Sequence, residues 1–573
     1  MPRSEVLDRR WRVEPPPEES VATALATGLG VPLPFARLLA QRGYADVAAA
    51  RRFLKPSRDD LADPLLLPDV DLAVERLLTA VRRGETVLVH GDYDVDGQCS
   101  TAIMTRTLRR LGAHAVPFVP HRLRDGYDLS AAGVEAAATA RAGLILALDC
   151  GTTAVEAVAS ARERGIDVIV VDHHLPGPAL PDALAFVNPK RPESTYPYPE
   201  LCGAGLAWKL SLALHRAATG EDAFAWHLLD LAALATVADL VPLTGENRII
   251  VRYGLRVLQA TRWPGLRALI AAAGLADKPI RAGQVAFVLG PRINAVGRVG
   301  DANDGLRLLL TDEPAEGERL AGQLERQNAE RQALDQRTLE EALEALEGAY
   351  DPGRDVGVVI ARDGWHPGVI GIVASRVVER IARPTFLVAL DGDVGKGSGR
   401  SVPRCDLHAA LSRCAAHLER WGGHRMAAGL TVRRGQLDAF REAFNAACAE
   451  QVRPEDLVPT QRVDAVLRLG DITGEFERLV RALEPTGMGN PGPVFGLEHV
   501  ALAGVRPIGE RHVRFVLEDG SARLRTVAWG LREEVERVAG AGASRLRAAV
   551  RLDRDTFLGQ ETVEGRLVAL AAD

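Results

Sequence analysis

Short apolar runs alternate with Ala-rich, helix-like stretches from about Asp71 onward. The runs Val87–Val89, Leu144–Leu148 and Val168–Val171 have strand length, and turn-forming residues bound them. Because parallel strands need a long crossover connection, strands that alternate with helices are typical of a doubly wound, largely parallel sheet. We therefore predict an α/β domain over residues 71–305.

A long polar segment with a thin stripe of leucines runs from Pro314 to about Leu346. An Asp–x–Pro start and a Gly stop frame it, as at the two ends of a helix. At about 1.5 Å per residue such a helix spans roughly 50 Å. A helix that is polar on most faces is typical of a connection between domains, so residues 306–350 are predicted to be a connecting helix. The stripe is too irregular for the alternative, a coiled-coil dimer.

The remaining segments follow other patterns. Residues 1–70 combine Pro-rich coil with helix-like segments such as Pro34–Arg42. Residues 351–455 are predicted to form a second α/β unit, with a strand at Val356–Ile360, a helix from Val369 and a strand at Thr385–Ala389.

Short alternating strands dominate residues 456–573. They are Val500–Val505, His512–Leu517, Leu524–Trp529, Arg545–Leu552 and Thr562–Leu570. Five strands with an interrupting polar segment fit a small barrel of the OB type. The expected fold is therefore two α/β lobes joined by a long helix, with an all-β barrel at the C-terminus.

Composition narrows the class of protein. With 573 residues, 47% of them hydrophobic and 25% charged, the chain is globular and too long for one domain. No apolar run is long enough to cross a bilayer and the N-terminus lacks an apolar signal core, so we expect a cytoplasmic protein without a membrane partner. Six scattered cysteines without a CxxC pair argue against structural zinc and against a disulfide framework.

Charge alone does not identify a partner. The net charge of −6 does not suggest nucleic acid, but a net value hides local patches. The basic residues are mostly Arg, which suits bidentate contacts with phosphate, although a GC-rich genome would also favour Arg codons. Both explanations stay open.

Each strand predicted in the first domain ends on carboxylates or imidazoles. These residues are Asp92, Asp94 and Asp96 after the first strand, Asp149 after the second, and Asp172, His173 and His174 after the third. Asp239 closes the apolar helical stretch Leu228–Val237. Because the carboxyl ends of neighbouring parallel strands share one crevice, we expect Asp94, Asp96, Asp149, His173 and His174 to converge.

Converging carboxylates repel one another unless cations neutralise them. Carboxylate oxygens with imidazoles suit Mn²⁺ or Mg²⁺, and two such ions about 3.5–4 Å apart form the usual clamp for in-line attack on a phosphodiester. The alternative is a calcium loop, which DxDxDG resembles. A calcium loop of the EF-hand type needs a Glu at its end, and Ala102–Leu108 contains none.

Several motifs resemble a known family. HGDYDVDG (His90–Gly97) with VVDHH (Val170–His174) resembles the DHH phosphoesterase superfamily. Further segments resemble its RecJ exonuclease family: GPRINAVGR (Gly290–Arg298), DGWHPGVIGIVASR (Asp363–Arg376), GSGRS (Gly397–Ser401), GGHRMAAG (Gly422–Gly429) and GMGNPGPVF (Gly487–Phe495). Short DHH motifs alone are shared with pyrophosphatases and small phosphodiesterases, whereas this order of motifs is more specific. The likeness runs from about Phe35 to the C-terminus.

The resemblance implies a metal-dependent exonuclease that degrades single-stranded DNA 5′→3′ to 5′-mononucleotides in recombination and repair, with two Mn²⁺ or Mg²⁺ ions. It implies DHH, DHHA1 and OB domains. Implied partners besides single-stranded DNA are a single-strand-binding protein and a RecQ-type helicase, and the chain is expected to be a monomer.

The resemblance also assigns site residues. Catalytic and metal-binding roles fall on Asp94, Asp96, Asp149, His173, His174 and Asp239, with Asp92 as a further metal ligand. Asp149 matches the carboxylate that bridges both ions, and Asp172 orients an imidazole. Arg292, Asn294 and Arg298 are expected to approach the substrate phosphates.

Two more groups of residues are expected to bind DNA. Gly397–Ser401 has the composition of a phosphate cradle, although a plain turn is the simpler explanation of its glycines. With the resemblance, Ser398, Arg400, Ser401 and His424 are expected to seat the terminal 5′-phosphate. In the barrel, Arg514, Phe515, Arg525, Trp529 and Arg551 are expected to hold single strands. The alternative is that the rings of Phe515, Trp529 and Phe557 form barrel core and the arginines a solvated face.

Two other functions compete with this one. A DHH hydrolase of short oligonucleotides or cyclic dinucleotides would not need a barrel that holds DNA. A non-catalytic DNA-binding replication factor, like the eukaryotic relative of RecJ, would have lost metal ligands, and none is lost here.

Overall fold

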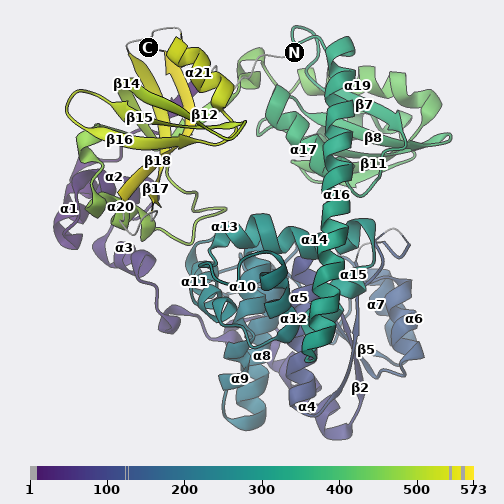
Figure 1. Cartoon of the computed structure of the whole chain (residues 1–573). Coiled ribbons are helices and arrows are strands. Elements are labelled where there is room, and N and C mark those ends of the chain that lie inside the picture. The colour runs from purple at the N-terminus through teal and green to yellow at the C-terminus, as the bar shows by residue number, and fades with distance from the viewer. Residues whose placement is uncertain (1–9, 123, 127, 541–544, 556–561, 573) are drawn as a thin grey trace. The chain divides into compact units, whose positions relative to one another are not determined.

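The computed structural model describes residues 10–122, 124–126, 128–540, 545–555 and 562–572. The chain forms two compact units, whose elements are labelled in Figure 1. The first unit contains residues 48–330 and 483–492; the second contains residues 1–47, 331–482 and 493–573. The short segment 483–492 therefore packs with the first unit, although the chain on both sides of it belongs to the second.

The first unit is built on a parallel sheet. Its strands are β2 Thr86–His90, β3 His114–Phe118, β4 Leu144–Leu148, β5 Asp167–Val171 and β6 Ala185–Val187. They lie in the order β3-β2-β4-β5-β6, and each neighbouring pair is parallel. Helices connect β2 to β3, β3 to β4 and β4 to β5, so the predicted doubly wound topology is confirmed.

Helices cover both faces of this sheet. They are α4 Val70–Arg83, α5 Val95–Arg110, α6 Ala131–Thr139, α7 Val155–Glu163, α8 Gly203–Thr219, α9 Ala223–His227, α10 Leu229–Ala238, α11 Gly245–Gln259, α12 Pro264–Ala272, α13 Ala282–Gln284, the π-helix η3 Val285–Leu289, α14 Gly290–Val299 and α15 Ala302–Leu310. Successive strand residues point to opposite faces. Leu88 and Ile145 pack with α6 and α7, whereas Val87 and Leu146 pack with α4, α5 and α8.

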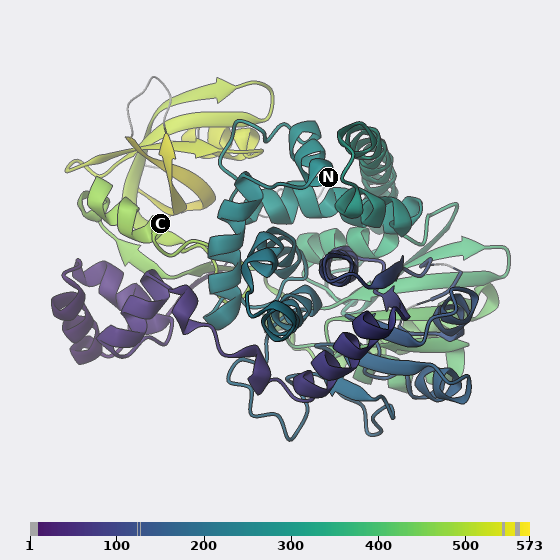
Figure 2. The same ribbon diagram turned by 90° about the horizontal axis from the view of Figure 1, so that it is seen from below.

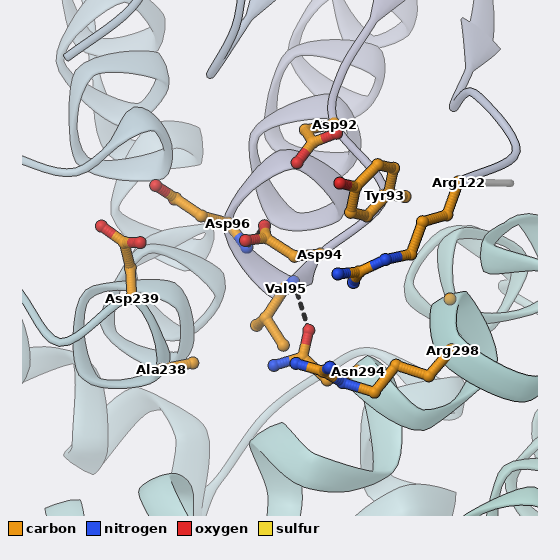
Figure 3. A pocket seen from close by; sticks show the side chains of 11 residues that line it. Asp92, Tyr93, Asp94, Val95, Asp96, Arg122, Ala238, Asp239, Asn294 and Arg298 are labelled. Carbon is orange, nitrogen blue, oxygen red and sulfur yellow. Dashed lines mark hydrogen bonds between the residues drawn. The ribbon is translucent and has the colours of Figure 1, made fainter. Parts of the chain in front are cut away.

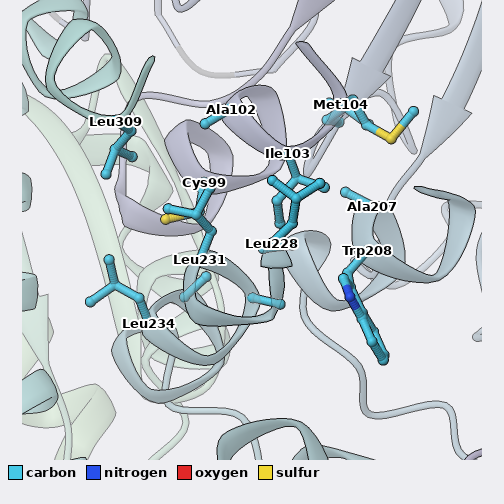
Figure 4. Close-up of a cluster of buried hydrophobic side chains, with 14 of the residues drawn as sticks. Cys99, Ala102, Ile103, Met104, Ala207, Trp208, Leu228, Leu231, Leu234 and Leu309 are labelled. Carbon is cyan, nitrogen blue, oxygen red and sulfur yellow. The ribbon is translucent and has the colours of Figure 1, made fainter. Parts of the chain in front are cut away.

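The larger core lies on the α5 side of the sheet. Figure 4 shows part of it, where Cys99 of α5 lies near Leu231 of α10, with Trp208 of α8 beyond. The whole of α5 from Val95 to Leu108 is buried. Because close packing fixes this helix, it is a rigid support for the acids at its N-terminus.

The predicted connecting helix is confirmed as α16, Pro314–Ala349 (Figure 1). Its early turns bury Leu320 and Leu324 in the core of the first unit. Its later turns bury Ala342 and Leu346 among side chains of the second α/β region. The leucine stripe is irregular because its two ends serve different cores.

The second α/β region has a mixed sheet. Its strands are β7 Val358–Asp363, β8 Thr385–Asp391, β9 Val394–Arg400, β10 Arg420–Gly423 and β11 Ala427–Arg433, and its helices are α17 Ile370–Ile381, α18 Leu407–Arg413 and α19 Leu437–Ala449. The strand order is β10-β11-β9-β8-β7. The predicted β7, α17 and β8 are confirmed, and β7 and β8 are parallel. The antiparallel strands β9, β10 and β11 were not foreseen.

The glycine-rich segment Gly397–Ser401 is not the turn or backbone cradle that its composition indicated. Gly397 to Arg400 belong to β9, whose backbone pairs with β8 on one side and β11 on the other. A Cβ at Gly399 would lie 2.4 Å from the ring of Phe386, and one at Gly397 would lie 2.6 Å from Leu430. The glycines therefore make room for apolar core side chains, and only side chains of this segment can reach a ligand.

The predicted OB-type barrel is confirmed. It contains β13 Ala465–Leu467, β14 Phe495–Ile508, β15 His512–Glu518, β16 Arg523–Ala528, β17 Leu546–Asp555 and β18 Thr562–Ala572, with helices α20 Gly474–Arg481 and α21 Arg532–Gly540. The strands lie in the order β13-β14-β15-β16-β18-β17, and pairing of β14 with β17 closes the barrel (Figure 2).

The N-terminal segment joins the barrel region through a long-range strand pair. Strand β1 Arg10–Val13 pairs in parallel with β12 Thr460–Val463. Helices α1 Glu19–Leu29, α2 Leu33–Gln41 and α3 Val47–Leu54 follow β1. All six cysteines are free and buried.

The membrane prediction was tested on the helices that the structure describes. None of them is by itself long and apolar enough to cross a bilayer. One bent pair, Glu19–Leu29 with Leu33–Gln41, reaches that length and composition only when its two helices are taken together.

Candidate metal centre

The turn between β2 and α5 holds the first acids of the site. Asp94 caps α5, and its Oδ1 accepts hydrogen bonds from the backbone nitrogens of Asp96 at 2.9 Å and Gly97 at 3.1 Å. A Cβ at Gly97 would lie 2.3 Å from the backbone nitrogen of Asp92. Because only glycine fits where the turn folds against the helix, the DxDxDG spacing follows from this packing.

The N-terminus of α8 supports the next carboxylates. The side chain of Asp96 accepts hydrogen bonds from the backbone nitrogens of Gly203 and Ala204, both at 2.7 Å. A helix N-terminus favours negative charge, so α8 stabilises this buried acid. A Cβ at Gly203 would lie 2.5 Å from the Cβ of Asp149. Gly203 was not foreseen, because its importance depends on tertiary packing alone.

His173 lies among the carboxylates. Its Nε2 is 3.2 Å from Asp149 Oδ1 and 3.8 Å from both Asp96 Oδ2 and Asp239 Oδ2. Within the described part of the chain, neither ring nitrogen of His173 has a hydrogen-bond partner, and neither have the buried Oδ1 atoms of Asp149 and Asp92. Buried polar atoms are nearly always hydrogen-bonded, so these atoms indicate a ligand.

The geometry of this cluster suits cations. Ligand atoms of Asp96, His173 and Asp239 all lie within 4.8 Å of one another. The same holds for a second group, which comprises Asp149, Asp172, His173 and His174. Carboxylate oxygens with imidazole nitrogens are ligands for Mn²⁺ and Mg²⁺. The residues present therefore fit the divalent ions that the sequence predicted.

The electrostatics also favour a cation. Burial, with repulsion from Asp94, raises the pKa of Asp92 to about 8. Burial, with repulsion from Asp96 and Asp94, raises the pKa of Asp239 to about 9. Burial likewise raises the pKa of Asp149 well above its ordinary value. A bound cation would offset both effects by favouring the charged carboxylates.

Asp172 has the orienting geometry expected of it. Its Oδ1 accepts hydrogen bonds from His174 Nδ1 and from the backbone nitrogen of His173, both at 2.7 Å. Its Oδ2 accepts one from the backbone nitrogen of Thr152 at 3.1 Å. Burial lowers the pKa of His174, but the hydrogen bond with Asp172, together with the attraction of Asp172 and the other acids, raises that pKa to about 9. Asp172 therefore fixes the ring of His174.

A pocket of about 330 Å³ opens onto these acids (Figure 3). Asp92, Asp94, Asp96 and Asp239 line it together with Tyr93, Arg122, Asn294 and Arg298. In Figure 3, Arg122 extends toward Asp94 from the side opposite Asp239, and Arg298 extends from the same side toward Asn294. Arg122 was not foreseen. The strand topology offered a signal, because Arg122 follows β3 at the same edge of the sheet.

The residues predicted on α14 separate into different positions. Asn294 lines the pocket, and its Oδ1 accepts a hydrogen bond from the backbone nitrogen of Val95 at 3.1 Å. Arg298 lines the pocket as well. Arg292 does not line this pocket; its Nε pairs with Glu325 at 2.6 Å and its Nη1 donates to the carbonyl of Val288 at 2.7 Å. Asn294 and Arg298, rather than Arg292, have the geometry expected of phosphate contacts.

The predicted phosphate residues of the second α/β region also separate. Ser398 and Arg400 lie beside the first turn of α17, since a Cβ at Gly371 would be 2.8 Å from Ser398 Oγ and 3.1 Å from Arg400 Nη2. The hydroxyl of Ser401 is buried and donates to the carbonyl of Cys405 at 2.7 Å. His424 is exposed beyond the end of β10. Ser398 and Arg400 form a compact group, whereas the hydroxyl of Ser401 is committed within the fold.

The barrel residues divide between core and surface. Phe515 is 1% exposed, so the expectation that its ring stacks on a base is wrong; the alternation of β15 points it into the core. Trp529 is 54% exposed, with its ring 4.9 Å from that of His512. Phe557 lies outside the described residues.

The predicted barrel arginines also differ in their surroundings. Arg514 and Arg525 form ion pairs with Glu564 at 3.4 Å and Asp555 at 3.2 Å. Arg551 is partly buried.

Comparisons with known proteins agree with this geometry. Three family models match the chain: the DHH family N-terminal domain over residues 86–236, the DHHA1 domain over residues 355–450 and the RecJ OB domain over residues 463–569. The first match contains most of the acids of the metal centre, and the second contains Ser398 and Arg400.

Curated relatives match most of the chain. The chain is 38% identical over 525 residues to the single-stranded-DNA-specific exonuclease RecJ of Bacillus subtilis. The aligned region covers 91% of this chain and 66% of that protein. It is 35% identical over 551 residues to the Escherichia coli RecJ, covering 92% of this chain and 94% of that protein. The crystal structure of RecJ in complex with Mn²⁺ from Thermus thermophilus matches with a TM-score of 0.83 and 34% identity, over 98% of this chain and 80% of that one. The chain therefore belongs to the RecJ family of single-stranded-DNA-specific exonucleases.

Proposed function

We propose that this chain degrades single-stranded DNA from its 5′ end and releases 5′-mononucleotides, with two divalent cations, Mn²⁺ or Mg²⁺, at the metal centre. The observation that carries the proposal is the set of buried, unpartnered ligand atoms on Asp92, Asp149 and His173, in a chain of this family. Solved RecJ structures hold Mn²⁺ or Mg²⁺, which supports the choice of cations.

The protein's own residues have distinct tasks in this proposal. When bound, the cations supply activation of the attacking water and stabilisation of the leaving 3′-oxygen. Asp94, Asp96, Asp149 and Asp239 would hold them, with Asp149 as the carboxylate that both cation sites would share. His174, held by Asp172, contacts the phosphate beside them.

The pocket arginines hold the substrate. Arg122 and Arg298 line the pocket of the acids and bring positive charge to it. Guanidinium groups donate several hydrogen bonds to phosphate oxygens, so these two residues orient the scissile phosphodiester. Asn294 supports them by holding the turn that carries Asp94.

The 5′→3′ direction rests on a second phosphate site. Ser398 and Arg400, beside the first turn of α17, are proposed to bind the terminal 5′-phosphate together with His424, which precedes strand β11, where Ala427 pairs with Arg400. A terminal phosphate carries more charge than an internal diester, so charge-assisted hydrogen bonds favour the chain end. The direction itself is implied by the family resemblance.

Two alternative functions explain the barrel and the metal ligands less well. A hydrolase of short oligonucleotides would not need the barrel that the RecJ OB model matches. A non-catalytic DNA-binding factor would be expected to lack metal ligands. The cytoplasmic location, the monomeric state, the single-strand-binding protein and the RecQ-type helicase stay predictions.

The direction can be tested with a long single strand labelled in turn at each end and digested with Mn²⁺. The proposal expects early release of 5′ label as mononucleotide, and slower digestion of a strand that lacks the 5′-phosphate. Arg400→Ala should remove the difference between the phosphorylated and unphosphorylated strands. Release of 3′ label first, or internal fragments before mononucleotides, would refute the direction.

A further inference from the structure

A buried side-chain amide joins two loops of the metal centre. Asn188 directly follows strand β6 and is completely buried. Its Nδ2 donates hydrogen bonds to the carbonyl of His174 at 2.9 Å and to the hydroxyl of Thr152 at 3.1 Å. His174 belongs to the loop that follows β5, and Thr152 belongs to the loop that follows β4. One side chain at the end of a third strand therefore bridges both loops.

The surroundings of this amide fix its orientation. Its Oδ1 accepts a hydrogen bond from the backbone nitrogen of Lys190 at 2.8 Å. Because an N–H group requires an acceptor and a carbonyl requires a donor, only one orientation of the amide satisfies both Lys190 and His174. A buried polar group that is hydrogen-bonded on both sides makes its surroundings rigid. Asn188 is therefore a rigid link between the two loops.

The two bridged loops supply the ligand atoms of one candidate cation site. Asp149 comes from the loop after β4, whereas the loop after β5 contributes Asp172, His173 and His174. Ligand atoms of these four residues lie within 4.8 Å of one another. Carboxylates this close repel each other unless a cation lies between them. Before a cation binds, this repulsion acts to separate the loops, and the hydrogen bonds of Asn188 oppose the separation.

The loop after β4 also needs support for its backbone. Asp149 has a φ of 59°, in the left-handed region that residues other than glycine rarely adopt. Such a conformation persists only where the surrounding structure holds it. Thr152 is held twice, because its backbone nitrogen donates to Asp172 Oδ2 at 3.1 Å and its hydroxyl accepts from Asn188. Asn188 therefore helps to keep Asp149 in the conformation that brings its Oδ1 to 3.2 Å from His173 Nε2.

We propose that Asn188 is a positioning residue of the metal centre, which holds Asp149 and the two histidines at the separation that a shared cation requires. It acts through Thr152 and His174, because a completely buried side chain does not reach DNA. Replacing residues that orient metal ligands in this way typically costs about 10–100-fold in metal affinity or activity. The inference rests on the proposed binding of cations and adds a residue from outside the acidic motifs that sets the geometry of their ligands.

The test is calorimetric titration of Mn²⁺ into the metal-free, full-length protein. Asn188→Ala removes the hydrogen bonds to both loops and should weaken Mn²⁺ binding by about 10-fold or more. Thr152→Val removes only the hydroxyl, keeps the shape of the side chain and should also weaken Mn²⁺ binding. Thr152→Ser retains the hydroxyl and should bind Mn²⁺ as the wild type does.

The matched control is a second amide that bridges backbone groups away from the metal centre. Asn445 lies on α19 in the second α/β region, and its Oδ1 accepts hydrogen bonds from the backbone nitrogens of Val356 at 2.8 Å and Gly357 at 3.0 Å. Asn445→Ala should lower the temperature of unfolding, because two backbone donors lose their acceptor. It should leave the Mn²⁺ affinity at the wild-type value.

Two further measurements separate positioning from folding. The variant Asn188→Ala/Thr152→Val should bind Mn²⁺ no more weakly than Asn188→Ala, because the hydroxyl acts through the amide. At a fixed Mn²⁺ concentration, Asn188→Ala should lower kcat on oligo(dT) and keep the wild-type KM, since it removes no contact with DNA.

The outcomes distinguish this inference from the proposed function. Wild-type Mn²⁺ affinity in the folded Asn188→Ala and Thr152→Val variants, or an equal loss of affinity in Asn445→Ala, overturns the positioning role. Mn²⁺ binding by the wild type then leaves the proposed function standing. If Asn188→Ala does not fold, wild-type Mn²⁺ affinity in Thr152→Val alone overturns the role. A wild type that binds no Mn²⁺ overturns both proposals.

Discussion

At the scale of single residues, the side chains of the metal centre differ in whether they also form hydrogen bonds within the fold. Among the residues that the structure describes, Asp149 Oδ1 and both ring nitrogens of His173 find no hydrogen-bond partner, and all three atoms are buried. Asp94 and Asp96, in contrast, use oxygens to bind backbone nitrogens of α5 and α8. Asp149 and His173 should therefore affect mainly the binding of cations, whereas Asp94 and Asp96 should also affect the stability of the fold.

Replacing Asp149 tests this division. Asp149→Asn keeps the volume but removes a negative charge from a buried cluster of acids, so the metal-free variant should unfold at a higher temperature than the wild type. It should also bind Mn²⁺ at least about tenfold more weakly, since the cations lose one charged ligand. Calorimetric titration and thermal unfolding measure the two effects. Unchanged Mn²⁺ affinity in the folded variant would contradict the role given to Asp149.

Asp172 should act through His174 rather than on the cations. Asp172→Asn removes the charged acceptor that holds the His174 ring at 2.7 Å. Loss of such an orienting partner typically costs about 10–100-fold in metal affinity or activity. Mn²⁺ binding and initial rates on oligo(dT) should both fall within that range. A loss as complete as that of the His173→Ala variant would instead mean that Asp172 is itself a ligand.

At the scale of elements, the sequence predicts the strands and helices that depend on local pattern. Strands β2, β4 and β5, helix α16 and the barrel strands follow from apolar periodicity and turn residues. The convergence of acids follows from parallel topology. The pairing of β1 with β12 could not be foreseen, because it joins segments far apart in the chain. The same limit hid Gly203, whereas Arg122 could have been inferred from its place after β3 and the burial of Phe515 from the alternation of β15.

The glycines of β9 show how one pattern can have two explanations. Their spacing matched a phosphate cradle, but they pack against Phe386 and Leu430. Gly399→Ala should destabilise the fold by about 1–3 kcal/mol, the usual cost of overpacking a core. Gly422→Ala is the matched control, since a Cβ there meets nothing within 4 Å. Denaturant unfolding of both variants measures the difference between their free energies of unfolding. Equal values would show that β9 accommodates the added methyl group without loss of stability.

At the scale of the whole molecule, a segment distant in sequence completes the catalytic unit. The buried guanidinium of Arg248 donates hydrogen bonds to the carbonyls of Leu483 at 2.8 Å, Glu484 at 2.9 Å and Pro485 at 3.2 Å. The backbone nitrogen of Leu243 donates to the carbonyl of Met488 at 2.7 Å. Leu243 lies four positions after Asp239, a proposed metal ligand, so residues 483–492 support the loop behind the metal centre.

Truncation after Pro459 should therefore remove more than DNA binding. Without residues 483–485, the buried charge of Arg248 has few hydrogen-bond acceptors. The free energy of unfolding should therefore fall by an amount on the order of 3–5 kcal/mol. The truncated chain should unfold at a lower temperature and cleave even trinucleotides slowly. Adding Arg248→Met to the truncated chain removes the stranded charge and should restore part of the stability. Full trinucleotide cleavage by the truncated chain would contradict this role of the segment.

The central claim is that the buried acids and His173 form the centre of a metal-dependent exonuclease for single-stranded DNA. The most direct measurement is digestion of one labelled sequence as a single strand and as a blunt duplex, with Mn²⁺ or with chelator, by the wild type and by Asp149→Asn. The expected result is mononucleotide release only from the single strand and only with Mn²⁺, with the variant slower by about a hundredfold to a thousandfold, the scale on which losing a strong electrostatic contributor acts. Digestion that persists in chelator, or that the folded Asp149→Asn variant carries out at the wild-type rate, would contradict the claim.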